Sequence, residues 1–199
     1  MHTFVSNDIN GNTPAAPRHW TSPGAGQRPV TGAGCTQVGM GQLKIGSRTD
    51  QLHALLGSCV GIAFLWKKGN CCALAHCLLP EAPGNQTRGE HLDQISARYV
   101  NKAVPAMLKL MGATEADYAD IVVVLAGGAN MLNGCSSRFQ VGQQNADAAR
   151  RHLRQLGLNV QYCRLGGKSG RTLTVDCATS SYTVGEIVTA QQDPHHAHA

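Results

Sequence analysis

Apolar residues occur in short runs separated by glycine-rich and polar turns, a pattern typical of a chain with many strands. Two of these runs, "SCVGIAFLW" and "CCALAHCLL", are joined by "KKGN". Glycine and asparagine tolerate the positive φ that a tight turn requires, so the two runs predict a β-hairpin with its turn at residues 67–70. Weak alternation predicts a strand before the hairpin, at residues 35–46. Three later runs predict closing strands at residues 158–167, 171–179 and 182–188.

Two segments carry apolar residues at the spacing of an amphipathic helix. The first spans residues 92–111, where Pro105 predicts a kink or break and Gly112 supplies a C-terminal stop. The second begins with Asn145 as its predicted capping residue and ends at Gly157. Its predicted apolar face consists of Ala146, Ala149, Leu153 and Leu156. Between the helices, residues 120–132 predict a buried strand that runs into a glycine turn.

The order of strands, helix, strand, helix and strands predicts an α+β or mixed α/β fold, a layered mixed-sheet sandwich with two main helices. At 199 residues the chain suits one domain, which we place at residues 35–190. Residues 1–34 are rich in Pro, Gly, Ser, Thr and Asn without an apolar period and predict a disordered arm. The polar residues 191–199 predict a flexible tail.

Charge and composition narrow the classes of partner. Lys and Arg exceed Asp and Glu by 17 − 12 = 5, and the one local basic cluster is Arg150–Arg154. With only nine aromatic residues (2 Trp, 4 Tyr, 3 Phe), a nucleic-acid module is not favoured. No run approaches the roughly 18 apolar residues of a membrane span, and the N-terminus lacks the features of a secretory signal. These features predict a cytoplasmic protein whose eight cysteines are thiols.

Cofactor and metal chemistry are not indicated. No "GxGxxG" or "GxxxxGK[ST]" opens a helix, so neither a dinucleotide site nor a phosphate loop is expected. A metal site would have to use Cys71, Cys72, His76 and Cys77. Their spacing lacks the C-x₂-C pair of a zinc ribbon, and a strand would distribute them over both of its faces. We therefore predict no metal.

One pair of residues could carry chemistry. Cys59 follows Gly57 and Ser58, small residues that let a ligand approach the backbone, and His76 stands seventeen positions later. Pairing residues whose numbers sum to about 135 places Cys59 opposite His76, at the roughly 4.5–5.5 Å of cross-strand neighbours. Two interpretations remain open. The pair is a nucleophile and its base, or a buried strand cysteine and a hydrogen-bonded core histidine.

Five segments together resemble the chemoreceptor glutamine deamidases of the CheD family. In chain order they are "LLGSCVGIAFLW", "ALAHCLLP", "VVVLAGGANML", "VGQQNADAARRHL" and "LGGKSGRTLTVDCATS", between about Val38 and Val188. The most specific element is "GSCV" with "AH" seventeen residues on. Gly142 with Asn145, and the glycines before Arg171, corroborate it.

The resemblance implies papain-like cysteine hydrolase chemistry without a cofactor on a layered α/β fold. Cys59 takes the nucleophile position and His76 the general-base position, with Gly57 and Ser58 in the neighbourhood of the substrate and the oxyanion. The implied reaction hydrolyses glutamine side chains on the cytoplasmic helices of methyl-accepting chemotaxis receptors, giving glutamate and ammonia. A chemotaxis phosphatase is a further partner that the resemblance suggests.

The chain departs from the family pattern at one position. The family usually has a threonine six residues before the cysteine, and this sequence has His53 there. Orientation of His76 is then expected from His53, from a backbone carbonyl, or from no adequate group, and His53 as a surface strand residue is an equal alternative. The rival function is a non-catalytic protein that binds receptors or the phosphatase on the same scaffold.

Overall fold

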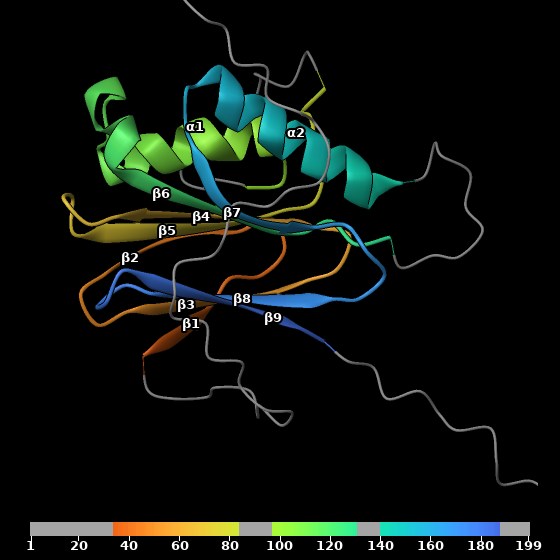
Figure 1. Cartoon of the computed structure of the whole chain (residues 1–199), viewed down its shortest axis with the longest axis horizontal. Helices are drawn as coiled ribbons and strands as arrows, with labels where there is room; N and C mark the ends of the chain where they lie inside the picture. The colour runs from red at the N-terminus through yellow and green to blue at the C-terminus, as the bar shows by residue number, and fades with distance from the viewer. Residues whose placement is uncertain (1–33, 84–96, 131–139, 188–199) are drawn as a thin grey trace, which may run out of the picture. The chain divides into compact units, whose positions relative to one another are not determined.

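Two β-sheets and a pair of α-helices form three layers in the computed structural model, which describes residues 34–83, 97–130 and 140–187 (Figure 1). The predicted tail lies outside the described residues, and so does the predicted arm apart from Gly34. The layered α+β sandwich predicted from the sequence is confirmed. Among the described residues, no helix is long and apolar enough to cross a membrane.

The central and outer sheets are built from different strands, and each sheet contains a single parallel pair among its described strands. The central sheet has the order β2 (Leu43–Ser47), β5 (Cys71–Cys77), β4 (Val60–Trp66), β6 (Ile121–Gly127) and β7 (Val160–Leu165). All its pairs are antiparallel except β6 with β7. The outer sheet has the order β1 (Cys35–Gln37), β3 (Gln51–Leu56), β8 (Arg171–Asp176) and β9 (Ser181–Glu186). In Figure 1 the central sheet lies between the helices and the outer sheet.

Strand β4 is buried along its whole length because it supplies two hydrophobic cores. Ile62 and Phe64 pack towards the helices, whereas Ala63 and Leu65 pack between the sheets. A strand that is covered on both faces needs apolar residues at every position, which is why this segment has a continuous apolar run in the sequence.

The predicted β4–β5 hairpin is present, but its register is two residues from the prediction. Val60 pairs with Cys77, so partner numbers sum to 137 and not to about 135. The turn consists of the four residues Lys67–Asn70. The Asn70 amide donates to the Lys67 carbonyl (3.0 Å), and Asn70 has a φ of 51°. An even shift leaves every side chain on its predicted face, because faces alternate with a period of two.

Helix α1 (Val100–Met111) is shorter than the predicted helix. Tyr99 is extended, so the helix begins after it, and the predicted start at residues 92–96 lies outside the described residues. The helix continues through Pro105 without the predicted break. Packing of its buried face on the central sheet stabilises the helix, although Pro105 removes one backbone hydrogen bond. Gly112, at φ 70°, ends the helix as predicted. A 3-10 turn, η1 (Glu115–Asp120), leads into β6.

Helix α2 (Val141–Gln155) begins four residues before Asn145, so the prediction that Asn145 caps the helix was wrong. The side chain of Asn145 is instead fully buried and bonded to other parts of the chain. Tertiary contacts here override the preference of asparagine for helix ends. Ala146, Ala149 and Leu153 are buried as predicted, whereas Leu156 lies beyond the helix and is 36% exposed. Gly157, at φ 71°, follows the helix end as predicted.

The first turn of α2 lies directly against the end of β6. A Cβ added to Gly142 would lie 2.6 Å from the carbonyl oxygens of Gly128 and Ala129. Glycine is therefore needed for this close approach, and it brings the buried face of α2 to the edge of the site described below.

Substitution of Gly142 tests this contact. Gly142→Ala is expected to lower the free energy of unfolding by about 1–3 kcal/mol, because the backbone must move to admit the methyl group. Gln143→Ala, on the exposed face of the same turn, should change it by less than about 0.5 kcal/mol. Urea denaturation measures both, and equal stabilities of the two variants would contradict the close approach.

Candidate active site

Each of the three carbonyl groups in the loop between β3 and β4, residues 57–59, accepts a hydrogen bond from another part of the chain. The carbonyl oxygens of residues 57, 58 and 59 accept hydrogen bonds from the Ala129 amide (2.8 Å), the Asn145 side-chain amide (3.1 Å) and the Gly128 amide (2.7 Å), respectively. These donors belong to the β6 end and to α2. One junction therefore fixes the whole loop.

The orientation of the carbonyls determines that of the amides. Within a trans peptide unit the C=O and the following N–H point in opposite directions, and the described residues contain no cis peptide. The Ser58 amide therefore points away from the Ala129 amide that the Gly57 carbonyl faces, and the Cys59 amide points away from the Asn145 side chain. The Cys59 amide acts to lower the pKa of its own thiol. Amide N–H groups of such a loop are the donors that an oxyanion requires.

Glycine is required where β6 approaches this loop. Gly127 has φ 102°, and a Cβ there would lie 2.3 Å from the Cys59 carbonyl oxygen. Gly128 follows at φ 64° and donates its amide to that oxygen. The "AGGA" segment of the sequence thus forms one wall of the Cys59 loop.

His76 is buried on β5, opposite Gly61 and on the face between the two sheets. Its Nδ1 lies 3.1 Å from the Val38 carbonyl oxygen. A carbonyl only accepts, so Nδ1 carries the proton and Nε2 of the neutral ring holds a lone pair. No donor within the described part of the chain reaches the buried Nε2. The ring is therefore oriented as a base with its accepting nitrogen free.

The main chain of His76 is fixed as well. Its amide donates to the Gln42 carbonyl (3.0 Å), and its carbonyl accepts from the Gly41 amide (2.8 Å). Together with Val38, the segment between β1 and β2 thus holds His76 at three points.

Cys59 and His76 lie at the same end of the β4–β5 hairpin. Cys59 stands one residue before the last pair, Val60 with Cys77, and the register of the hairpin makes His76 its diagonal neighbour. Diagonal neighbours are separated by about 7–8 Å. The register thus places Cys59 and His76 at one end of the hairpin as diagonal neighbours, and not directly opposite as predicted.

Burial shifts both groups towards their neutral forms. It raises the pKa of the Cys59 thiol, against the smaller effect of its own amide. It also lowers the pKa of His76, although the Val38 hydrogen bond acts in the other direction. The resting pair is therefore a thiol and a neutral imidazole, so thiolate forms only as the proton is transferred.

The neighbouring Cys77 is not a competing nucleophile. Its side chain faces the helices and is fully buried. Burial, with a smaller contribution from the charge of Cys59, strongly raises the pKa of the Cys77 thiol. A buried thiol of this kind remains protonated and inert.

His53 lies on the face of β3 opposite the core residues Leu52 and Ala54. Its Nδ1 lies 2.8 Å from Thr174 Oγ1 on β8. Its carbonyl accepts from the Val38 amide (2.7 Å), and the Val38 carbonyl in turn holds His76. Of the three sources considered for orienting His76, the structure contains a backbone carbonyl, that of Val38. Participation of the His53 side chain stays a prediction.

Two buried polar residues, Asn145 and Arg171, were not assigned to the site from the sequence, which predicted Asn145 only as a helix cap. Asn145 donates to the carbonyls of Ser58 (3.1 Å) and Leu78 (2.8 Å). Arg171 is 4% exposed and donates to the carbonyls of Gly127 and Gly166 (2.6 Å), joining the ends of β6 and β7. The spacing of glycines before Asn145 and Arg171 was visible in the sequence, but their distant partners were not.

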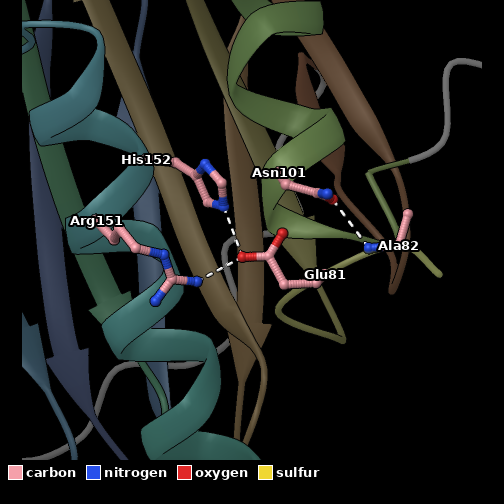
Figure 2. A network of polar contacts seen from close by, with 5 residues as sticks. All are labelled: Glu81, Ala82, Asn101, Arg151 and His152. Atoms are coloured by element: carbon pink, nitrogen blue, oxygen red, sulfur yellow. Dashed lines mark hydrogen bonds and ion pairs between the residues drawn. The ribbon is translucent and has the colours of Figure 1, made fainter. Parts of the chain in front are cut away.

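The segment that follows β5 is tied to both helices (Figure 2). The Glu81 carboxylate accepts from Arg151 and from His152 (2.7 Å) of α2, and the Ala82 amide donates to Asn101 Oδ1 of α1 (3.1 Å). Partial burial opposes ionisation, but the two donors hold the pKa of Glu81 below its usual value. The chain leaving His76 is therefore anchored on the helix layer.

The metal alternative finds no support in the geometry. Within residues 34–83, 97–130 and 140–187, no group of three or more His, Cys, Asp or Glu side chains could hold a metal ion. Cys72 and His76 face the space between the sheets, whereas Cys77 faces the helices.

A cavity of about 540 Å³ lies away from Cys59 and His76, between the end of α2 and β7, and its lining includes Arg150, Arg154 and Cys163.

Comparison with known proteins identifies related chains. The family profile "CheD chemotactic sensory transduction" matches residues 78–186, which lie C-terminal to Cys59 and His76 and include Asn145. The "Probable chemoreceptor glutamine deamidase CheD" of Bdellovibrio bacteriovorus is 38% identical over 140 residues, 69% of this chain and 86% of the relative. "CheD 2" of a Ruegeria species, with the same description, is 37% identical over 75% and 90% of the two chains. The protein so named from Methanococcus vannielii is 30% identical over 74% and 92%.

The lowered pKa of His76 predicts how stability depends on pH. The unfolded chain protonates this histidine first as pH falls below the ordinary value of 6.5, so the unfolded state binds more protons and stability is lost. The melting temperature should therefore decrease as the pH is lowered from about 7.5 to about 5.5, and it should decrease less steeply in His76→Asn. His53→Thr measures the separate contribution of His53 to the profile, because burial also lowers the pKa of that histidine. Parallel profiles of wild type and His76→Asn would contradict a buried, neutral His76.

Proposed function

The chain belongs to the CheD family, and on that premise we propose that it is a cytoplasmic protein-glutamine deamidase. Its substrates are glutamine side chains on the cytoplasmic helices of methyl-accepting chemotaxis receptors, which it converts to glutamate with release of ammonia. The observation that carries this proposal is the buried Nε2 of His76, which holds a lone pair and is unpartnered within the described chain, at the hairpin end that carries Cys59.

Acylation begins with a proton transfer. As the Cys59 sulfur attacks the carboxamide carbon, its proton passes to His76 Nε2. The carbonyl oxygen of the substrate becomes an oxyanion and accepts hydrogen bonds from the amides of Cys59 and Ser58, whose own peptide carbonyls are bonded to Asn145 and to Ala129. Collapse of this intermediate breaks the C–N bond, and His76 returns the proton to the leaving nitrogen, which departs as ammonia. A thioester on Cys59 remains.

Deacylation uses the same base. The neutral imidazole takes a proton from water, whose oxygen attacks the thioester carbon. The C–S bond breaks, the sulfur recovers its proton from His76, and glutamate leaves. The net change is one amide and one water converted to one carboxylate and one ammonium ion. No cofactor enters this balance.

The alternative is a protein that binds receptors or a chemotaxis phosphatase without turnover. The free base nitrogen of His76 favours the catalytic function, because a purely structural core histidine would be expected to satisfy both ring nitrogens. The phosphatase remains a proposed regulatory partner.

Substitution of the nucleophile tests the mechanism. Cys59→Ala is expected to abolish ammonia release from a receptor fragment while the fold is retained, and Cys163→Ser, which removes an exposed thiol, should leave the rate unchanged. His76→Asn should retain less than about a hundredth of the rate, since positioned acid–base groups contribute about 10²–10⁴-fold. Mass spectrometry of the fragment locates the deamidated glutamines. Wild type that binds the fragment but releases no ammonia would establish the binding alternative.

His53→Thr tests whether the side chain at that position takes part. If His53 contributes as predicted, its protonated form opposes the protonated His76, so the variant should show an acidic limb of activity at lower pH and a higher rate. Superimposable pH–rate profiles of wild type and variant would confine residue 53 to its main-chain contact with Val38.

A further inference from the structure

Asn145 joins two chain segments at the point where their β-ladder stops. The last β4–β5 pair is Val60 with Cys77. One residue beyond it, the Leu78 amide is turned to the Arg98 carbonyl (3.1 Å), so Leu78 is not donating towards the loop before β4. The Asn145 side-chain nitrogen fills this place and donates to the carbonyls of Ser58 and Leu78.

These two acceptors flank the reacting residues. Ser58 immediately precedes Cys59, and Leu78 follows His76 by two positions on the same chain. An asparagine carboxamide has two N–H donors on one nitrogen, enough for one bond to each carbonyl. Aspartate would place a carboxylate against two carbonyl oxygens, and alanine would leave both without this donor.

Burial alone does not explain why an asparagine stands at position 145. Asn145 is fully buried, and its Oδ1 finds no donor within the described part of the chain. An unpaired buried amide oxygen is a cost that an apolar residue at this position would not incur. The two donors, not the apolar contacts, distinguish asparagine from the alanines that follow along this face of α2.

We propose that Asn145 is a positioning residue for catalysis, which fixes the Cys59 loop relative to the strand that carries His76. The proposal rests on the proposed deamidase function and adds a residue that acts through two others. Asn145 stands one helical turn after Gly142, whose close approach sets the distance of α2 from the loop. Release of the Ser58 carbonyl lets the loop rotate, which turns the Cys59 amide and sulfur away from their working directions.

The kinetic test separates positioning from substrate binding. Asn145→Ala and Asn145→Asp are expected to lower kcat by about 10–100-fold, since displacements on the order of 1 Å can cost 10²-fold, with KM within about twofold of wild type. Gln144→Ala, on the exposed side of the preceding position, is the matched control and should alter neither. Circular dichroism confirms that the variants are folded. A raised KM with unchanged kcat would overturn the proposal.

A second readout needs no substrate. Iodoacetamide alkylation of Cys59, followed by mass spectrometry of its peptide, is measured for wild type, His76→Ala, Asn145→Ala and the double variant. His76→Ala should slow alkylation at neutral pH in the parent chain but have little further effect once Asn145 is replaced. Coupling of contacting or networked residues corresponds to roughly 2–150-fold in such a cycle. If Asn145→Ala does not fold, Asn145→Asp takes its place.

The alkylation cycle tests the positioning role of Asn145 without relying on deamidation activity. Independent effects of the two substitutions would overturn the positioning role of Asn145. An unchanged alkylation rate in His76→Ala alone would also overturn it, because no pairing would exist for Asn145 to maintain. Coupled alkylation without any ammonia release by wild type would uphold the role of Asn145 and reject the deamidase function.

Discussion

The site depends on one constraint, which is that the three consecutive carbonyls of residues 57–59 must all find donors outside their own loop. The end of β6 and helix α2 supply them. Glycines at 127, 128 and 142 are needed because the donors approach within distances that no Cβ would allow. The geometry of the peptide unit then turns the Ser58 and Cys59 amides away from these donors. A satisfied backbone thus leaves amide donors for the oxyanion of the proposed hydrolysis.

His76, the proposed base, is also positioned by the backbone. Val38 receives a hydrogen bond from His76 at its carbonyl and donates its amide to the carbonyl of His53. A main-chain link of this kind does not depend on the residue type at position 53. This offers a physical account of how a histidine can stand where the family usually has a threonine. Burial keeps both Cys59 and His76 neutral at rest, which limits unwanted thiol reactions before the substrate arrives.

Several elements followed from local sequence signals. The apolar runs on either side of "KKGN" predicted the hairpin, because a chain buried on both faces admits few polar residues. The stops at Gly112 and Gly157 followed from the tolerance of glycine for positive φ. The register was wrong by two residues although the turn lies at the predicted residues 67–70, because a turn at those residues gives partner numbers that sum to 137 and not to about 135. Alternation preserved the face of His76 despite this error.

The sequence by itself determined the layered fold, the strand faces and the candidate pair Cys59 and His76, since these depend on periodicities and turn residues within short stretches of chain. Only the tertiary structure decided the role of Asn145, which local preference had assigned to a helix cap. Its partners are 87 and 67 residues away. The same holds for Val38 as the acceptor for His76, 38 residues apart. Contacts of this range arise when separate elements pack together, and a propensity or a period within one segment carries no information about them.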